Sequence, residues 1–218
     1  MGIKFESLDA IIFDLDDTLV DEGDWIEKRW EKTIEFVENR LGIVGFGESF
    51  WEIYSERGRK YKKHVNKALE RCGRDEQLVG EIVTFFLGQT TFEEPFSGVI
   101  EFLEEAVKKF KLGIITNGKK EVQIGRISRL GIADYFSSIV CAYEFPKPNP
   151  YPYSIGLMEL DVEPSRSAYV SHDQDDFDGA KLSGMKTVHL NMFSNNEMEN
   201  VDLEISDFSE FLEIIRSG

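Results

Sequence analysis

Five short apolar runs recur along the chain and are separated by amphipathic stretches. The runs, rich in Ile, Val and Leu, cover residues 8–15, 111–115, 138–141, 168–171 and 186–190. Runs of this length predict buried strands of a parallel sheet. Helical spacing of apolar residues is clear in 98–110 and weaker in 119–130, 151–160 and 177–183. This alternation predicts an α/β fold with a Rossmann-like, doubly wound parallel sheet, and a further strand and a closing helix at 208–215 should complete it.

Residues 21–92 interrupt the alternation. They contain no convincing strand pattern, and helical patterns extend over 24–41, 50–72 and 75–87. We therefore predict an α-helical cap domain at 21–92, inserted into a core made of 1–20 and 93–218. Both linkers, Glu22-Gly23 and 89–95, leave from the end of the first strand, so the insertion is placed to act as a lid.

Two features of the insertion stand out in the sequence. The basic run from Arg57 to His64 is expected to be a solvated helix face, with a phosphate-attracting patch as the alternative. Most of the aromatic residues are expected to form the core of a small helical domain. Trp25, close to the outgoing linker, is the candidate to reach the active site and help select the substrate.

Charge and cysteine content narrow the classes of partner. The chain has 41 acidic and 25 basic residues among 218, a net charge of −16. Nucleic acid and anionic membranes would be repelled over most of such a surface. No apolar run approaches the roughly 20 residues that a membrane span needs. Cys72 and Cys141 cannot form a disulfide framework, so we expect a cytoplasmic protein; its oligomeric state is not indicated.

Polar segments follow four of the predicted strands. Asp14-Leu15-Asp16-Asp17-Thr18 comes after the first, Thr116-Asn117-Gly118 after the second, Lys147 after the third and Ser171–Asp176 after the fourth. Each segment alone has an ordinary use as a turn, a loop or a helix cap. Parallel topology, however, gathers the carboxyl ends of strands along one crevice. We therefore expect the four segments to form one site.

With these segments in this order, the chain resembles the haloacid dehalogenase superfamily of phosphotransferases over nearly its whole length. The segments similar to its four motifs are Asp14-x-Asp16-x-Thr18, Thr116-Asn117-Gly118, Lys147 and Asp173–Asp176. The resemblance implies that Asp14 is the nucleophile, forming an aspartyl-phosphate, and that Asp16 is the general acid/base. It also implies a Mg²⁺ ion bound by Asp14, by the backbone carbonyl of Asp16 and by an acid of the fourth motif.

Simple electrostatics supports this implication. Three carboxylates and a phosphate dianion would concentrate five negative charges, which a divalent cation and Lys147 would largely offset. The available ligand atoms are oxygens, which favours Mg²⁺ over zinc. The hydroxyls of Thr18 and Thr116 and the amides of Asn117 and Gly118 are the expected donors to the phosphate oxygens.

Asp16 favours one reaction over its rivals. Cleavage of a phosphate ester expels an alkoxide that needs a proton, whereas expulsion of halide needs none. The sequence therefore predicts a Mg²⁺-dependent phosphatase that acts on a small phosphorylated metabolite. The alternatives are a 2-haloacid dehalogenase-type hydrolase, a phosphomutase and, in another class, a non-catalytic phosphoryl-accepting or binding module. The helical insertion argues against the last of these.

The fourth segment departs from the common phosphatase pattern. Its form, Ser171-x-Asp173-x-x-Asp176, is closer to the dehalogenase branch of the resembled superfamily. Asp173 is the first candidate for the fourth-motif metal ligand and Asp176 the second, directly or through water. His172 is open to three readings: a ligand, a hydrogen-bond partner or an ordinary loop residue.

Overall fold

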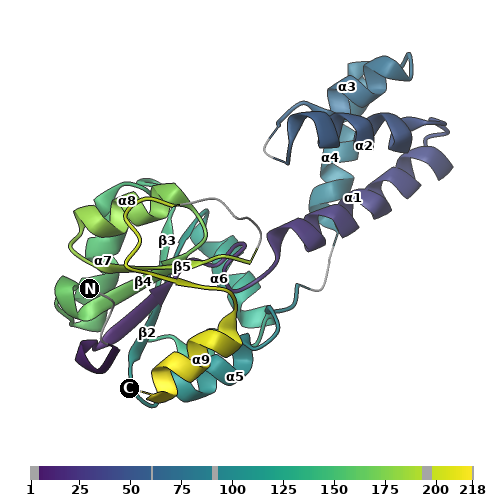
Figure 1. Ribbon diagram of the computed structural model, residues 1–218. Helices are drawn as coiled ribbons and strands as arrows, with labels where there is room; N and C mark the ends of the chain where they lie inside the picture. The colour runs from purple at the N-terminus through teal and green to yellow at the C-terminus, as the bar shows by residue number, and fades with distance from the viewer. Residues whose placement is uncertain (1–4, 60, 90–92, 193–197, 218) are drawn as a thin grey trace. The chain divides into compact units, whose positions relative to one another are not determined.

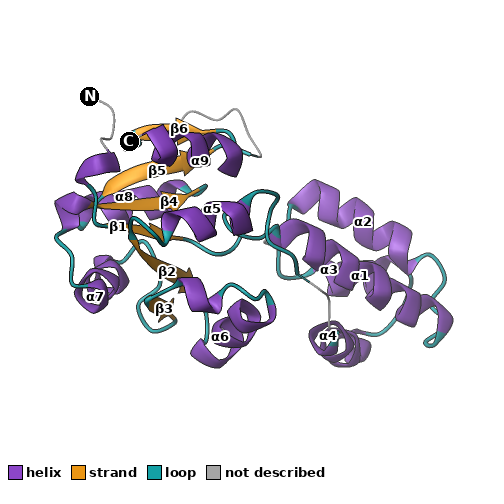
Figure 2. Cartoon of the chain, turned by 90° about the horizontal axis from the view of Figure 1, so that it is seen from below, coloured by secondary structure: helices purple, strands orange, loops and turns teal. Residues whose placement is uncertain are grey.

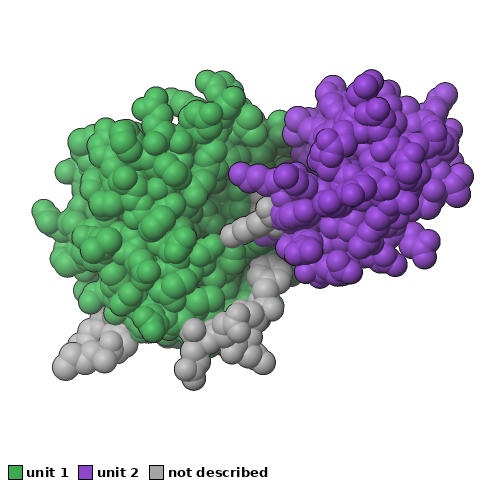
Figure 3. All heavy atoms as spheres, turned by 90° about the horizontal axis from the view of Figure 1, so that it is seen from above, with its two compact units in different colours: residues 1–21, 93–218 green, residues 22–92 purple. Residues whose placement is uncertain are grey.

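The computed structural model describes residues 5–59, 61–89, 93–192 and 198–217. Contacts divide the chain into two compact units (Figures 1 and 3). Unit 1 comprises residues 1–21 and 93–218, and unit 2 comprises Glu22–Phe92. Of the predicted return linker, Thr90–Phe92 lies outside the described residues.

Unit 1 is built on a parallel sheet. Its described strands are β1 (Ala10–Phe13), β2 (Lys111–Asn117), β3 (Ser138–Ala142), β4 (Ser167–Ser171), β5 (Lys186–Leu190) and β6 (Leu203–Ile205). They lie in the order β3-β2-β1-β4-β5-β6, and every neighbouring pair is parallel. This order confirms the predicted Rossmann-like sheet. The order reverses at β1, between β2 and β4, and ligands bind at such a switch point.

Helices cover both faces of this sheet (Figure 2). Ile11 and Phe13 of β1 point into one core cluster, and Ala10 and Ile12 point into the other. The first cluster includes side chains from α5 (Val99–Ala106), α6 (Lys120–Arg129) and α9 (Phe208–Ser217). The second includes side chains from α7 (Pro150–Leu160) and α8 (Gln174–Leu182). Because successive strand residues face opposite sides, a continuous apolar run is what a doubly covered strand requires.

Unit 2 is helical and has its own apolar core. Its described helices are α1 (Glu22–Asn39), α2 (Phe46–Arg57), α3 (His64–Arg71) and α4 (Val79–Gly88), with the 3₁₀ turn η2 (Glu76–Leu78) before α4. The described residues of unit 1 also form the 3₁₀ turns η1 (Phe5–Ser7), η3 (Ala133–Tyr135) and η4 (Pro164–Arg166). None of the described helices is both long and apolar enough to cross a bilayer.

The helix expected over 50–72 is wrong as a single element. Gly58 ends α2 with a φ of 74°, and its N–H donates to the Tyr54 carbonyl at 2.9 Å. A glycine in this left-handed region stops a helix at little cost. The basic run is therefore a connection between two helices and not one solvated helix face; Lys60 lies outside the described residues.

Candidate active site

The loop after β1 curls immediately beyond Asp14. The Asp14 N–H donates to the Val170 carbonyl of β4 at 3.0 Å, which continues the sheet by one residue. The N–H groups of Leu19 and Val20 then both donate to the Leu15 carbonyl, at 2.9 and 3.2 Å. Asp17 has a φ of 55°, a left-handed conformation that Asp tolerates better than most residues. The curl leaves the Asp14 carboxylate at the carboxyl end of the sheet.

Lys147 joins the first and fourth segments. Its Nζ donates to Asp14 Oδ1 at 2.6 Å and to Asp176 Oδ2 at 2.8 Å. The three side chains are only 4%, 8% and 6% exposed, for Lys147, Asp14 and Asp176. Asn117 fixes the backbone of this lysine, because its Oδ1 accepts from the Lys147 N–H at 2.9 Å. The expected meeting of segments far apart in the chain is thus present in the geometry.

Burial and mutual attraction shift the pKa values of the Asp14 and Lys147 side chains in this cluster. Burial is the largest influence on Asp14 and raises the pKa of its carboxyl to about 7, against the attraction of Lys147 and with support from Asp176 and Asp16. Burial alone would lower the pKa of Lys147, but its attraction to Asp14 and Asp176 outweighs this and leaves the pKa raised. Lys147 is the cation shared by these two buried carboxyl groups, and a further positive charge nearby would favour their ionised forms.

The two candidate metal ligands of the fourth segment, Asp173 and Asp176, lie in different surroundings. Asp173 precedes α8, and its Oδ1 accepts from the Asp175 N–H at 3.1 Å as a helix cap. Asp176 Oδ2 accepts from Lys147, from Ser171 Oγ at 2.7 Å and from the Tyr169 hydroxyl at 3.4 Å. Asp176 therefore belongs to the lysine cluster, whereas Asp173 lies at the start of the helix.

His172 lies against the first loop. Its Nδ1 is 3.4 Å from Thr18 Oγ1, and its Nε2 is 3.8 Å from an Asp17 carboxylate oxygen. Burial lowers the pKa of this imidazole, against the attraction of the nearby acids. The contact joins the first and fourth segments on the side of Thr18.

The second segment is held from α6. The Gln123 Nε2 donates to Thr116 Oγ1 at 2.9 Å and to the Asn117 carbonyl at 2.8 Å. Gly118 has a φ of 131°, and a Cβ there would lie 3.3 Å from Gln123 Nε2. Glycine is thus required for the tight approach of this loop to the helix.

Asp16 faces a cation that sequence reasoning did not single out. Arg126 donates through both terminal nitrogens to Asp16, at 2.5 Å to Oδ1 and 3.2 Å to Oδ2. Its Nε donates to Glu93 Oε2 at 2.9 Å. Burial opposes the charge of this guanidinium, but its pairing with Asp16 and Glu93 leaves its pKa raised. In the sequence, Gln123 and Arg126 are three residues apart in the predicted helix over 119–130, a spacing that places both side chains on the same helix face.

The residues at this site fit a magnesium ion. Among the described residues no three His, Cys, Asp or Glu side chains are grouped closely enough to form a ready metal site. Mg²⁺ does not require such a group, because it keeps several waters and uses one or two carboxylates. Burial raises the pKa of Asp14 even beside Lys147, so additional positive charge would be needed to hold this carboxyl in its ionised form. A divalent cation beside an all-oxygen donor set would supply that charge.

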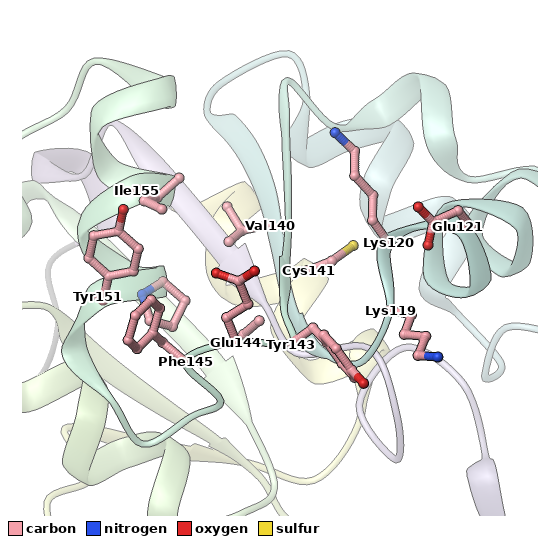
Figure 4. A pocket seen from close by; sticks show the side chains of 12 residues that line it. Lys119, Lys120, Glu121, Val140, Cys141, Tyr143, Glu144, Phe145, Tyr151 and Ile155 are labelled. Carbon is pink, nitrogen blue, oxygen red and sulfur yellow. The ribbon is translucent and has the colours of Figure 1, made fainter.

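A separate cavity of about 380 Å³ lies at the edge of the sheet (Figure 4). It is lined by the start of α6, the end of β3 and the start of α7, including Lys119, Cys141 and Tyr151. The Lys119 Nζ lies 5.6 Å from the Tyr143 ring, and burial raises the pKa of the Cys141 thiol. None of the described residues that line it is one of the predicted site residues.

Comparison with known proteins places the chain in a family. The family model described as haloacid dehalogenase-like hydrolase matches residues 11–190. The glyceraldehyde 3-phosphate phosphatase of Methanopyrus kandleri is 28% identical, over 95% of this chain and 97% of that protein. The phosphoglycolate phosphatase of Yersinia pseudotuberculosis is 27% identical, over 86% of this chain and 83% of its own.

A solved structure points to another branch of the same family. The crystal structure of a 2-haloacid dehalogenase from Pseudomonas syringae pv. Tomato is 28% identical, with a TM-score of 0.65, and covers 96% of this chain and 99% of that one. The chain belongs to the haloacid dehalogenase-like hydrolases. It is therefore an enzyme, a hydrolase, and the resemblance found in its four segments is confirmed.

Proposed function

We propose that this hydrolase is a phosphatase that cleaves a small phosphorylated metabolite through a covalent intermediate on Asp14. The observation that carries the proposal is the pairing of Asp14 with Lys147 at the switch point of the sheet, with Asp16 two residues further on. The relatives named as phosphatases of small phosphorylated compounds support the same class of substrate.

The chemistry follows from the positions of these groups. A carboxylate oxygen of Asp14 attacks phosphorus and the bond to the ester oxygen breaks, while Asp16, which enters this step in its protonated form, gives that oxygen its proton and becomes a carboxylate. A water molecule then attacks phosphorus and passes a proton to Asp16, which releases inorganic phosphate and restores Asp14.

Lys147 and the Thr116 hydroxyl hold the phosphate oxygens, since phosphoryl transfer depends mainly on positioning and charge. Thr18 and the amides of Asn117 and Gly118 are the further donors we assign to them.

Magnesium is the cofactor we propose for this site. Asp14, the backbone carbonyl of Asp16 and Asp173 would hold the ion, which supplies positive charge to the phosphate oxygens when bound. We rank Asp176 second because its Oδ2 already accepts from Lys147, Ser171 and Tyr169. Asp176 would then act mainly by orienting Lys147.

The helical unit completes the proposal. We propose that residues 21–92 act as a cap domain for a core of 1–20 and 93–218, with Trp25 helping to select the substrate. The support lies in the chain path: Val20 and Pro95 form an antiparallel bridge, and the Phe96 N–H donates to the Leu19 carbonyl at 3.0 Å. The outgoing and returning segments thus leave unit 1 side by side, next to the loop that carries Asp14.

We also propose a cytoplasmic location, without a nucleic-acid or membrane partner.

The decisive test is release of inorganic phosphate by the variant D14N. We expect turnover of p-nitrophenyl phosphate to fall by about a thousandfold or more, because the attacking oxygen is replaced by an amide. D175N, which changes an exposed acid of the fourth segment, is the matched control and should retain turnover. EDTA should abolish turnover and Mg²⁺ should restore it. Unchanged rates in D14N would refute the mechanism.

A 2-haloacid dehalogenase is the second candidate. It is favoured by the form of the fourth segment, in which Ser171, Asp173 and Asp176 keep the dehalogenase-like spacing, and by the 2-haloacid dehalogenase structure that is 28% identical. Halide released from a 2-haloacid without added metal, together with no phosphate release from any phosphorylated sugar, acid or nucleotide tested, would replace our first proposal with this one. A phosphomutase would instead leave the phosphate on the sugar.

A further inference from the structure

A buried ion cluster joins the first loop to α6 and to the start of the returning chain. Arg126 is flanked by Asp16 and Glu93, and the Arg126 and Glu93 side chains are only 8% and 11% exposed. Nη1 also donates to Gln123 Oε1 at 2.9 Å. A charged group is costly to bury unless its hydrogen bonds are satisfied, and here the three sides of the guanidinium each have an acceptor.

The contact between Arg126 and the Asp16 carboxylate is bidentate. Both oxygens of Asp16 accept from Arg126, at 2.5 and 3.2 Å, so the contact restrains the rotation of the carboxylate as well as its position. A planar guanidinium fork confers this directional restraint, which a lysine ammonium cannot reproduce. Asp16 itself is 23% exposed, so its free edge remains accessible to a substrate.

The same helix reaches the phosphate-binding segment. Gln123 accepts from Arg126 and donates to Thr116 Oγ1 at 2.9 Å. One chain of hydrogen bonds therefore runs from Asp16 through Arg126 and Gln123 to Thr116. A shift of Arg126 would move the proton donor relative to the phosphate.

We propose that Arg126 is the positioning residue for Asp16, with Glu93 and Gln123 holding the guanidinium in place. This inference rests on the proposed function, because it assigns to Asp16 the proton transfer to the leaving group. Arg126 does not touch the reacting atoms; it sets the direction from which Asp16 meets the ester oxygen. Glu93 is the first residue of unit 1 after the chain returns from unit 2, so the same cation also anchors the returning segment.

The test compares R126Q and R126K with R129Q, an exposed arginine one turn further along α6. With an alkyl phosphate as substrate, we expect kcat of R126Q to fall by about a hundredfold, while KM stays within about twofold. With p-nitrophenyl phosphate the loss should be smaller, because that leaving group needs less help from an acid. R126K keeps the charge but loses the fork, so its kcat should lie between R126Q and wild type. R129Q should match wild type.

A double-mutant cycle separates positioning from a structural role. In a D16N background, R126Q should change kcat by less than about twofold, since the group that it positions is already lost. An equal loss of kcat with and without Asp16 would overturn the inference. If R126Q does not fold, as judged by circular dichroism, R126K and the D16N/R126Q double variant decide, because each leaves fewer buried charges unpaired.

D14N, measured in the same assay, distinguishes failure of the role proposed for Arg126 from failure of the proposed function. Loss of turnover in D14N, together with wild-type kcat in R126K and R126Q, overturns the role of Arg126 alone. Unchanged turnover in D14N overturns the proposed function, and this inference with it.

Discussion

The two units bury different kinds of side chain. Unit 1 encloses two clusters of titratable groups: Lys147 pairs with Asp14 and Asp176, and Arg126 pairs with Asp16 and Glu93. Unit 2 encloses rings: Phe50 is fully buried and contacts aromatic side chains that include Trp30, Tyr54 and His64. Ion pairs in a core give little net stability, whereas packed rings give much.

From the different kinds of buried side chain we infer different roles for the two units. A buried ion cluster is poor evidence for stability, so its presence at the switch point of the sheet indicates chemistry. The aromatic core of unit 2 needs no such explanation, because it folds a small helical unit. All three tryptophans of the chain, Trp25, Trp30 and Trp51, lie in unit 2. Tryptophan fluorescence therefore reports on unit 2, and loss of β-sheet signal in circular dichroism reports on unit 1.

The largest effect is expected from K147M. Removing this cation leaves Asp14 and Asp176 buried without their partner, which should cost about 3–5 kcal/mol in the free energy of unfolding. Urea denaturation followed by circular dichroism measures the loss in unit 1, and the fluorescence transition of unit 2 should not move. K119M removes an exposed lysine and serves as the control. Equal shifts of both signals would show that the units do not unfold separately.

F50A is the converse experiment in unit 2. Truncating this buried ring should cost about 3–5 kcal/mol through the lost burial and the cavity left behind. Here the fluorescence transition should shift to lower urea while the sheet signal of unit 1 stays in place. A shift confined to unit 1 would contradict the separate cores.

G179A should have a smaller effect, in unit 1. A Cβ at Gly179 of α8 would lie 2.7 Å from the Pro148 carbonyl oxygen and 2.7 Å from Tyr153 Cε2. Overpacking of this kind costs about 1–3 kcal/mol, and it should also displace the loop that carries Lys147 and lower turnover. G80A in α4 is the control, because no atom lies within 4 Å of its added Cβ. An unfolding free energy for G179A at or above wild type would show that α8 can move away without cost.

Much of unit 1 follows from the apolar pattern. The run through β1 supplies Ile11 and Phe13 to one face and Ala10 and Ile12 to the other, and such a run implies a doubly covered parallel strand. Parallel strands in turn bring their carboxyl ends together. This is why Asp14 and Lys147, 133 residues apart, could be expected at one site.

The features that the sequence did not predict depend on the detailed structure of loops and helix faces. Arg126 is polar, and periodicity alone does not distinguish a polar residue that faces solvent from one that faces a buried acid. The break at Gly58 depends on one backbone angle within an otherwise helical pattern. The different surroundings of Asp173 and Asp176 depend on how a single turn places two acids three residues apart.

The smallest expected effect is a pH dependence confined to unit 2. His64 is 5% exposed, contacts Phe50, Tyr54 and Tyr61, and its Nε2 has no hydrogen-bond partner. Burial lowers the pKa of this imidazole below its ordinary value of 6.5, against a backbone hydrogen bond with Gly58. The folded state therefore prefers the neutral ring. The stability that this preference contributes is complete above pH 6.5 and declines as the pH falls below it, because the unfolded chain takes up the proton first.

H64F removes the titrating group and keeps a ring in the same place. The fluorescence midpoint of wild type in urea should fall between about pH 7.5 and about pH 5.5, relative to that of H64F over the same range. Other acids and bases titrate in both proteins, so the difference between the two curves isolates His64. Parallel curves would show that the imidazole is protonated as readily in the folded unit as in the unfolded chain. A divergence seen in the fluorescence but not in the sheet signal would locate the effect in the aromatic core and separate it from the ion clusters of unit 1.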